Sequence, residues 1–206
     1  MKSVFKLFVL FFILLPAYTG CSFEKSPVAG NYQVIEERIP IADYSEIEIN
    51  LPAEVIYQQH SDSLPYLQIN TDDNILSHLN IRVENNRLIV EAKPDSIISP
   101  TKLTIYTTST SLAKVKINGS GDLRLAGEVN SPDLALAITG SGEIRTDSLL
   151  CDKLRIDLNG TGKVALTGAA GTSFLNVNGA GNIDMSEYFS EKIESCINGV
   201  TETIES

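Results

Sequence analysis

The stretch that decides the fold is KVKINGSGDLRL (114–125), and later segments repeat its pattern: LALAITGSGEIRT (134–146), LRIDLNGTGKVAL (154–166) and FLNVNGAGNIDM (174–185). A degraded copy, SCINGVTETI (195–204), follows. The first glycines of these segments are spaced by 21, 20, 19 and 20 residues and are Gly119, Gly140, Gly160, Gly179 and Gly199. A regular period of this length is typical of repeat architectures, in which each unit packs only on its neighbours.

Apolar residues alternate with polar or small residues on both sides of each Gly-x-Gly turn. In the third copy, Ile156 and Leu158 precede the turn, and Val164 and Leu166 follow it. Alternation with a period of two predicts short strands with one buried face. Glycine allows the positive φ angles that a tight corner needs. Each repeat is therefore predicted to hold two strands joined at a Gly-x-Gly corner.

Two all-β architectures fit this pattern. An array of antiparallel hairpins is one, because Asn-Gly between alternating runs is a strong hairpin signal. A solenoid, or parallel β-helix, is the other, and the near-constant period favours it. The residue before the first glycine adds support, since stacked amides at about 4.8 Å would form a hydrogen-bonded ladder along the corner. That column is Asn118, Thr139, Asn159, Asn178 and Asn198.

The segment from residue 32 to 110 is also rich in alternating runs, but it lacks the period. We expect strands at 46–52, 54–58, 66–70, 79–84, 87–92 and 102–107, with a tight turn at Asn85-Asn86. Asp72 or Asp73 could begin a single helical turn. This half is predicted to form irregular first coils that cap the stack.

The N-terminus predicts export. Lys2 and Lys6 precede the apolar run LFVLFFILL (7–15), which is too short to cross a membrane core as a helix, and small residues follow it. Thr19-Gly20-Cys21 resembles the lipobox of bacterial lipoproteins, although Tyr18 stands where that pattern prefers Leu. This resemblance implies lipidation at Cys21 and anchoring to a membrane, most simply the outer membrane. An ordinary signal peptide with a chance cysteine is the alternative. The expected divisions are a signal peptide (1–20), a tether (21–31) and one domain (32–206).

The recurring Gly-x-Gly turns, together with DYSEIEINLPAEVIYQ (43–58) and NTDDNILSHLNIRVENNRLIVEA (70–92), resemble the head GIN domain of putative autotransporter adhesins. That family is common among exported lipoproteins of Gram-negative bacteria. The resemblance covers roughly residues 35–206 and implies a right-handed β-solenoid with a role in adhesion or surface interaction. It brings no catalytic residues. Gly199-Val200 departs from the turn pattern, so the resemblance does not define how the last coil closes.

Charge and composition exclude several classes of function. Removing the first 20 residues, with two lysines and no acid, takes the formal net charge from −10 to −12, which disfavours nucleic acid as a partner. A Ca²⁺ site at the corner is disfavoured, because the residue after the second glycine runs Asp122, Glu143, Lys163, Asn182 and the lysine would repel the ion. We expect no metal and no cofactor.

Cys151 and Cys196 are expected to be buried free thiols, although a disulfide between them stays open.

A charged outward face is predicted from Asp122, Arg124, Glu143 and Arg145. It could be a charge-balanced solvent face, or its carboxylates could serve a glycan-active enzyme such as a polysaccharide lyase or hydrolase. We expect a non-catalytic envelope lipoprotein whose flat solenoid face binds a glycan or a protein. An envelope structural or assembly role is a further alternative, and the sequence leaves the oligomeric state open.

Overall fold

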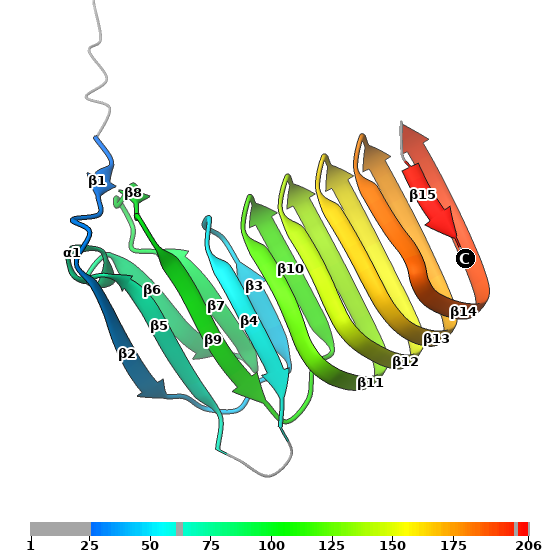
Figure 1. Cartoon of the computed structure of the whole chain (residues 1–206), viewed down its shortest axis with the longest axis horizontal. Helices are drawn as coiled ribbons and strands as arrows, with labels where there is room; N and C mark the ends of the chain where they lie inside the picture. Colours follow the sequence, from blue (N-terminus) through cyan, green and yellow to red (C-terminus); the bar gives the residue numbers. More distant parts are fainter. Residues whose placement is uncertain (1–25, 61–63, 200–201, 206) are drawn as a thin grey trace, which may run out of the picture.

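The computed structural model describes residues 26–60, 64–199 and 202–205, and these form a β-solenoid with one short helix, α1 (Asp73–Leu76) (Figure 1). No helix in this part of the chain is long and apolar enough to span a membrane. The strands are β1 (Val28–Ala29), β2 (Val34–Pro40), β3 (Glu46–Ile49), β4 (Glu54–Gln59), β5 (Tyr66–Asp72), β6 (Leu79–Glu84), β7 (Arg87–Ala92), β8 (Ile98–Ser99), β9 (Leu103–Ser109), β10 (Lys114–Gly119), β11 (Asp122–Gly140), β12 (Glu143–Gly160), β13 (Lys163–Gly179), β14 (Asn182–Gly199) and β15 (Glu202–Glu205).

Equivalent residues of successive repeats lie side by side in parallel register, which confirms the solenoid and excludes the hairpin array. Ile117 pairs with Ile138, Ile138 with Leu158, and Leu158 with Val177. All four side chains are buried. Each repeat therefore contributes one coil, and its apolar alternation becomes columns of buried side chains that run along the solenoid.

Each coil has two walls with the core between them. Wall A holds the strand segments that lead into the corner: β6, β7, β3, β10 and the C-terminal parts of β11 to β14. Wall B holds those that follow the corner: β2, β5, β9, β4, the N-terminal parts of β11 to β14, and β15. At the other side of the coil, β11 to β14 bend without interruption (Figure 1).

The unequal repeat lengths are absorbed at this bend. The pairing of β11 with β12 shifts register between Leu125 and Glu128, where Gly127 has a φ of 73°. The later pairings shift between Arg145 and Leu149 and between Ala165 and Thr167. The corner register is thus kept from Gly119 to Gly199, because one-residue differences become bulges on the opposite side.

The N-terminal half continues the walls by a different chain path. β3 pairs with β10 and β4 with β11, so the β3–β4 coil stacks directly on the repeats. On the side of this coil away from the repeats, β7 pairs with β3 and β9 pairs with β4, although β7 and β9 come later in the sequence. The expected first coils are present, but beyond them the sheet turns antiparallel through β2, β5 and β6. The sequence did not predict β2.

Local turns in this half follow the sequence. Asn85 and Asn86, both with positive φ, join β6 to β7 as the predicted tight turn. α1 begins after Asp72, but the Asp72 carboxylate does not cap it. Instead that buried carboxylate accepts hydrogen bonds from the Thr101 backbone N–H and hydroxyl and from the Tyr32 N–H. These bonds, Thr101 first, hold the pKa of Asp72 below its ordinary value.

The folded part of the chain begins inside the stretch expected to be a tether. β1 pairs with β8, and Gly30 packs against the Asp72 carboxylate, where any side chain would collide with it. The predicted signal peptide and Cys21 lie outside the described residues.

Candidate functional site

The corner column forms a polar ladder, but an incomplete and exposed one. The Asn178 amide donates to Asn159 Oδ1 at 3.1 Å, and the Asn198 amide donates to Asn178 Oδ1 at 3.2 Å. Thr139, aligned between Asn118 and Asn159, has no such bond in the described structure. The backbone completes the corner, because the carbonyl oxygens of Gly119, Gly140 and Gly160 accept N–H bonds from the next turn.

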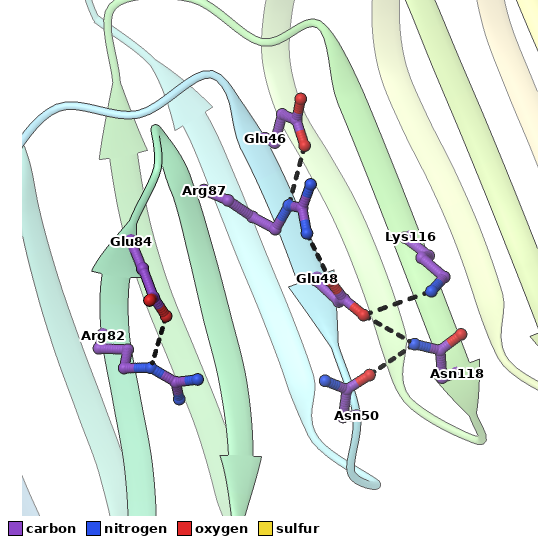
Figure 2. Close-up of polar contacts among 8 residues, drawn as sticks. All are labelled: Glu46, Glu48, Asn50, Arg82, Glu84, Arg87, Lys116 and Asn118. Atoms are coloured by element: carbon purple, nitrogen blue, oxygen red, sulfur yellow. Dashed lines mark hydrogen bonds and ion pairs between the residues drawn. The ribbon is translucent and has the colours of Figure 1, made fainter.

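The ladder extends one step further than the sequence predicted. The Asn118 amide donates to Asn50 Oδ1 at 2.6 Å and to Glu48 Oε1 at 3.1 Å (Figure 2). The available signal was that EIEIN (46–50) aligns with KVKIN (114–118). Glu48 also pairs with Arg87 and Lys116, so this network joins β7, β3 and β10 on the outside of wall A. Burial raises the pKa of Glu48. Lys116, Arg87 and Asn118 together lower this pKa by more than burial raises it, so it stays below its ordinary value.

The predicted charged face lies on wall B and contains an open groove of about 850 Å³. The four predicted residues line it, with additional acids: Glu54, Asp147, Asp184 and Glu187. In the outward column Arg124, Arg145, Ala165, Asp184, the short side chain of Ala165 stands between longer ones. The prediction of a flat face is therefore wrong for wall B, because one small residue in a column of long side chains makes a hollow.

Register places like charges beside each other in this groove. Asp122 aligns with Glu54 on one side and Glu143 on the other, and Arg124 aligns with Arg145. These four residues therefore do not face opposite charges at directly aligned positions of neighbouring strands. Charge balance comes from other partners. The Arg145 guanidinium donates two hydrogen bonds, of 2.7 and 3.0 Å, to the Glu143 carboxylate on its own strand. The Arg124 guanidinium donates two hydrogen bonds, of 3.0 and 2.9 Å, to the Asp147 carboxylate on the next coil.

Asp147 is a groove residue that the sequence argument missed. Its carboxylate also accepts the Gly127 N–H, which ties the bend of one coil to the next. Continuing the period-two alternation past Arg145 would have placed it on the outward face. The hydrogen bond from Arg124, its main partner, lowers the Asp147 pKa.

Asp122 is the groove acid whose pKa is raised, whereas the pKa values of Asp147 and Asp184 are lowered. Partial burial raises its pKa, and the negative charges of Glu143 and Glu54 raise it further. The Glu143 N–H, which donates to Asp122 at 3.1 Å, and the Arg145 charge only partly offset this. Asp122 thus carries a charge that its neighbours disfavour.

The remaining candidates do not converge. The column Asp122, Glu143, Lys163, Asn182 is stacked as predicted, and the described residues contain no group of His, Cys, Asp and Glu side chains arranged to hold a metal ion. Cys151 and Cys196 are both free. Cys151 is half-buried, with Sγ 3.6 Å from the Tyr188 hydroxyl, whereas Cys196 is exposed, contrary to the expectation of two buried thiols.

Comparison with known proteins places the chain in a family. The family model described as "Putative auto-transporter adhesin, head GIN domain" matches residues 43–203. The chain belongs to this family. Among curated proteins none matches the chain.

Solved structures share the fold of this GIN-domain chain. A putative adhesin from Bacteroides fragilis superposes with a TM-score of 0.80 at 24% identity, covering 85% of this chain and 81% of its own. A protein from Parabacteroides distasonis described as a putative lipid binding protein gives 0.62 at 21% identity, with 87% and 100% covered. A putative adhesin from Parabacteroides merdae gives 0.55 at 20% identity, with 88% and 100% covered. At these identities the likeness concerns the fold alone.

Proposed function

We propose that this GIN-domain protein is a non-catalytic binding module of the cell envelope, anchored by lipid at Cys21, which binds a glycan or protein ligand in the wall B groove. The observation that carries this proposal is the stacking of Glu54, Asp122 and Glu143, which helps to raise the Asp122 pKa. A face selected for stability alone would place opposite charges in neighbouring register positions. Membership of an adhesin-head family supports an exported, surface-interacting role.

The arginines give the groove a fixed geometry. A bidentate Arg–carboxylate pair holds both side chains in one orientation. Arg145 with Glu143 and Arg124 with Asp147 therefore present their remaining N–H groups and oxygens at defined positions above the rigid sheet. Such preorganised donors and acceptors suit a hydroxyl-rich or charged ligand, since little side-chain entropy is lost on binding.

The anchor and the binding site can be tested with one soluble form. Replacing Cys21 with Ser should release the full chain from the membrane fraction with its fold intact, whereas retention on the membrane would contradict the anchor. The released protein is then screened on glycan and host-protein arrays, and its bound ligand is titrated by calorimetry.

Arg155 offers a matched control for the groove. The Arg155 guanidinium donates two hydrogen bonds to Asp157, of 2.7 and 3.0 Å, which are the same lengths as those from Arg145 to Glu143. Arg155, however, lies on wall A. Arg145→Ala should weaken ligand binding about tenfold, the loss expected for a charge-assisted hydrogen bond. Arg155→Ala should leave binding unchanged. Equal effects of the two variants would contradict the groove as the binding site.

The raised Asp122 pKa also favours a second candidate, a glycan-active enzyme in which Asp122 acts as a general acid. Release of reducing ends from polysaccharides by the Cys21→Ser protein, abolished by Asp122→Asn, would support this candidate against the binding module. Retained ligand with no release of reducing ends would support the binding module.

A further inference from the structure

The C-terminal end of wall A is a strand edge. Lys192–Gly199 of β14 pairs with β13 on one side. β15 pairs only with Asn182–Met185, on wall B. Within the residues that the structure describes, nothing pairs with the other side of Lys192–Gly199. An edge of this kind presents free backbone donors and acceptors for another strand.

The inward face of this edge is uncharged and carries two isoleucines. Ile193, Ser195 and Ile197 occupy the inward register positions, and Ile197 ends the column that contains Leu158 and Val177. Ile197 is 43% exposed, whereas Leu158 and Val177 are fully buried. The charged side chains Lys192 and Glu194 pair with each other at 2.6 Å.

The opposite end of the molecule has two edges, β6 on wall A and β2 on wall B, and the β2 edge is protected. On β2, Glu37 aligns with the buried Ile69 and so occupies an inward position, and Pro40 ends the strand. An inward charge and a proline at an edge both oppose pairing with a further strand. A head-to-tail stack that continues both walls would place β2 of one copy against the β15 side of another and bury Glu37, so a head-to-tail assembly is disfavoured.

We propose that two copies of this chain meet tail to tail through antiparallel pairing of Lys192–Gly199 about a twofold axis at Ser195. In an antiparallel pair, directly opposite residues share a face. This register therefore sets Ile193 opposite Ile197 of the second copy on the inward side. Main-chain hydrogen bonds would supply the affinity, as in other cases of strand addition. The interface is isologous and closed, so it makes dimers rather than fibres.

Neighbouring registers fit less well. An axis at Glu194 would set that carboxylate opposite its own copy, and like charges directly opposite are unfavourable. An axis at Cys196 would set Ile193 opposite Gly199 and leave the isoleucine without an apolar partner. Only the register centred on Ser195 pairs both isoleucines without facing charges of the same sign.

A disulfide trap tests the dimer and its register in the full chain, in the oxidising compartment to which it is exported. Glu194→Cys places a thiol directly opposite Cys196 of the second copy. In the wild type the two Cys196 residues lie diagonally, with Cα atoms about 7–8 Å apart, beyond the usual reach of a disulfide. Non-reducing electrophoresis should show a reducible dimer for Glu194→Cys and none for the wild type. The absence of that dimer, or an equal one from the wild type, would overturn the proposal.

Two controls separate this edge from unspecific cross-linking. Glu36→Cys, on the exposed β2 edge, should give no dimer, and equal dimer from it would count against tail-to-tail pairing. Adding Ile197→Lys to the Glu194→Cys chain should reduce the dimer at least tenfold, because it places a charge on the inward side of the edge. Ile35→Lys, at an inward position of β2, should leave the dimer unchanged. If Ile197→Lys keeps the dimer while protease resistance shows a folded chain, the proposed register is wrong.

Discussion

The repeat half (114–199) and the N-terminal half (34–109) build the same two walls by different means. In the repeat half each coil follows the last in the sequence, whereas the β3–β4 coil lies between the repeats and the later β7 and β9. Even so, the inward column Val90, Ile49, Ile117, Ile138 crosses the boundary without a break. Matching alternation at each wall is thus sufficient to stack a coil, and the period is needed only to supply consecutive coils.

The corners of the two halves differ more than their walls. The β3–β4 corner is Asn50-Leu51-Pro52-Ala53, without glycine, whereas each repeat has Gly-x-Gly. A Cβ at Gly119, which faces that glycine-free corner, would contact nothing within 4 Å, but a Cβ at Gly160 would collide with the Gly140 carbonyl oxygen. Glycine is therefore required by close stacking of one corner on another, in addition to its positive φ.

The largest effect is expected at these corners. Both glycines have φ above 100°, so alanine is strained at either position. Gly160→Ala adds a backbone collision and should cost about 3–5 kcal/mol of unfolding free energy, whereas Gly119→Ala should cost about 1–2 kcal/mol. Urea denaturation of the two variants measures the difference. Equal losses would mean that φ alone selects glycine.

The shared column provides the next comparison. Ile49 in the N-terminal half and Leu158 in the repeats are both fully buried. Replacing either with alanine should cost about 2–4 kcal/mol, while Ile197→Ala at the open edge should cost less than about 1 kcal/mol in the monomer. If Ile49→Ala proves much milder than Leu158→Ala, the N-terminal half is less tightly coupled to the stack than its register indicates.

The exposed amide ladder should matter less. Asn178 both donates and accepts a ladder bond, whereas Asn198 only donates one. Asn178→Leu should cost about 1 kcal/mol, and Asn198→Leu about half of that. Indistinguishable, negligible losses in thermal denaturation would show that these asparagines act as turn formers within their own repeats.

The smallest effects are expected from pH, with opposite signs in the two halves. The Glu48 pKa is lowered, so its contribution to stability is present above its ordinary value of 4.5 and is lost as the pH falls through the folded-state pKa. The Asp122 pKa is raised, so its ionised form costs stability above the folded-state pKa, and that cost disappears as the pH falls toward 3.8.

At neutral pH, Glu48→Gln should therefore lower the free energy of unfolding in urea and Asp122→Asn should raise it. Each change should be about 0.5 kcal/mol or less, because these charges lie on the protein surface. The Asp122→Asn difference should vanish as the pH falls below 3.8, whereas the Glu48→Gln difference should persist below pH 4.5 until the pH passes the lowered folded-state pKa of Glu48. A loss of stability in Asp122→Asn at neutral pH would contradict the strained acidic stack in the groove.

The repeat half could be predicted from sequence because its signal is local. The period located each corner, and the alternation around Ile138 and Leu158 correctly predicted their common column. The order of β3, β7 and β9 could not be predicted, since any alternating strand can pair at a compatible wall. The groove was missed for a similar reason. Its shape depends on which side chains meet in a column, and the small Ala165 is informative only after Arg145 and Asp184 are known to flank it.

The constant corner register also makes the length of the molecule adjustable. β1 lies at one end of the solenoid and β15 at the other (Figure 1). Each coil of about 20 residues adds about 4.8 Å to the distance between those ends, and its contacts resemble those of the coil before it. Duplication or loss of one coil-encoding segment would therefore lengthen or shorten the reach of the protein in fixed increments while leaving every other coil with an equivalent neighbour.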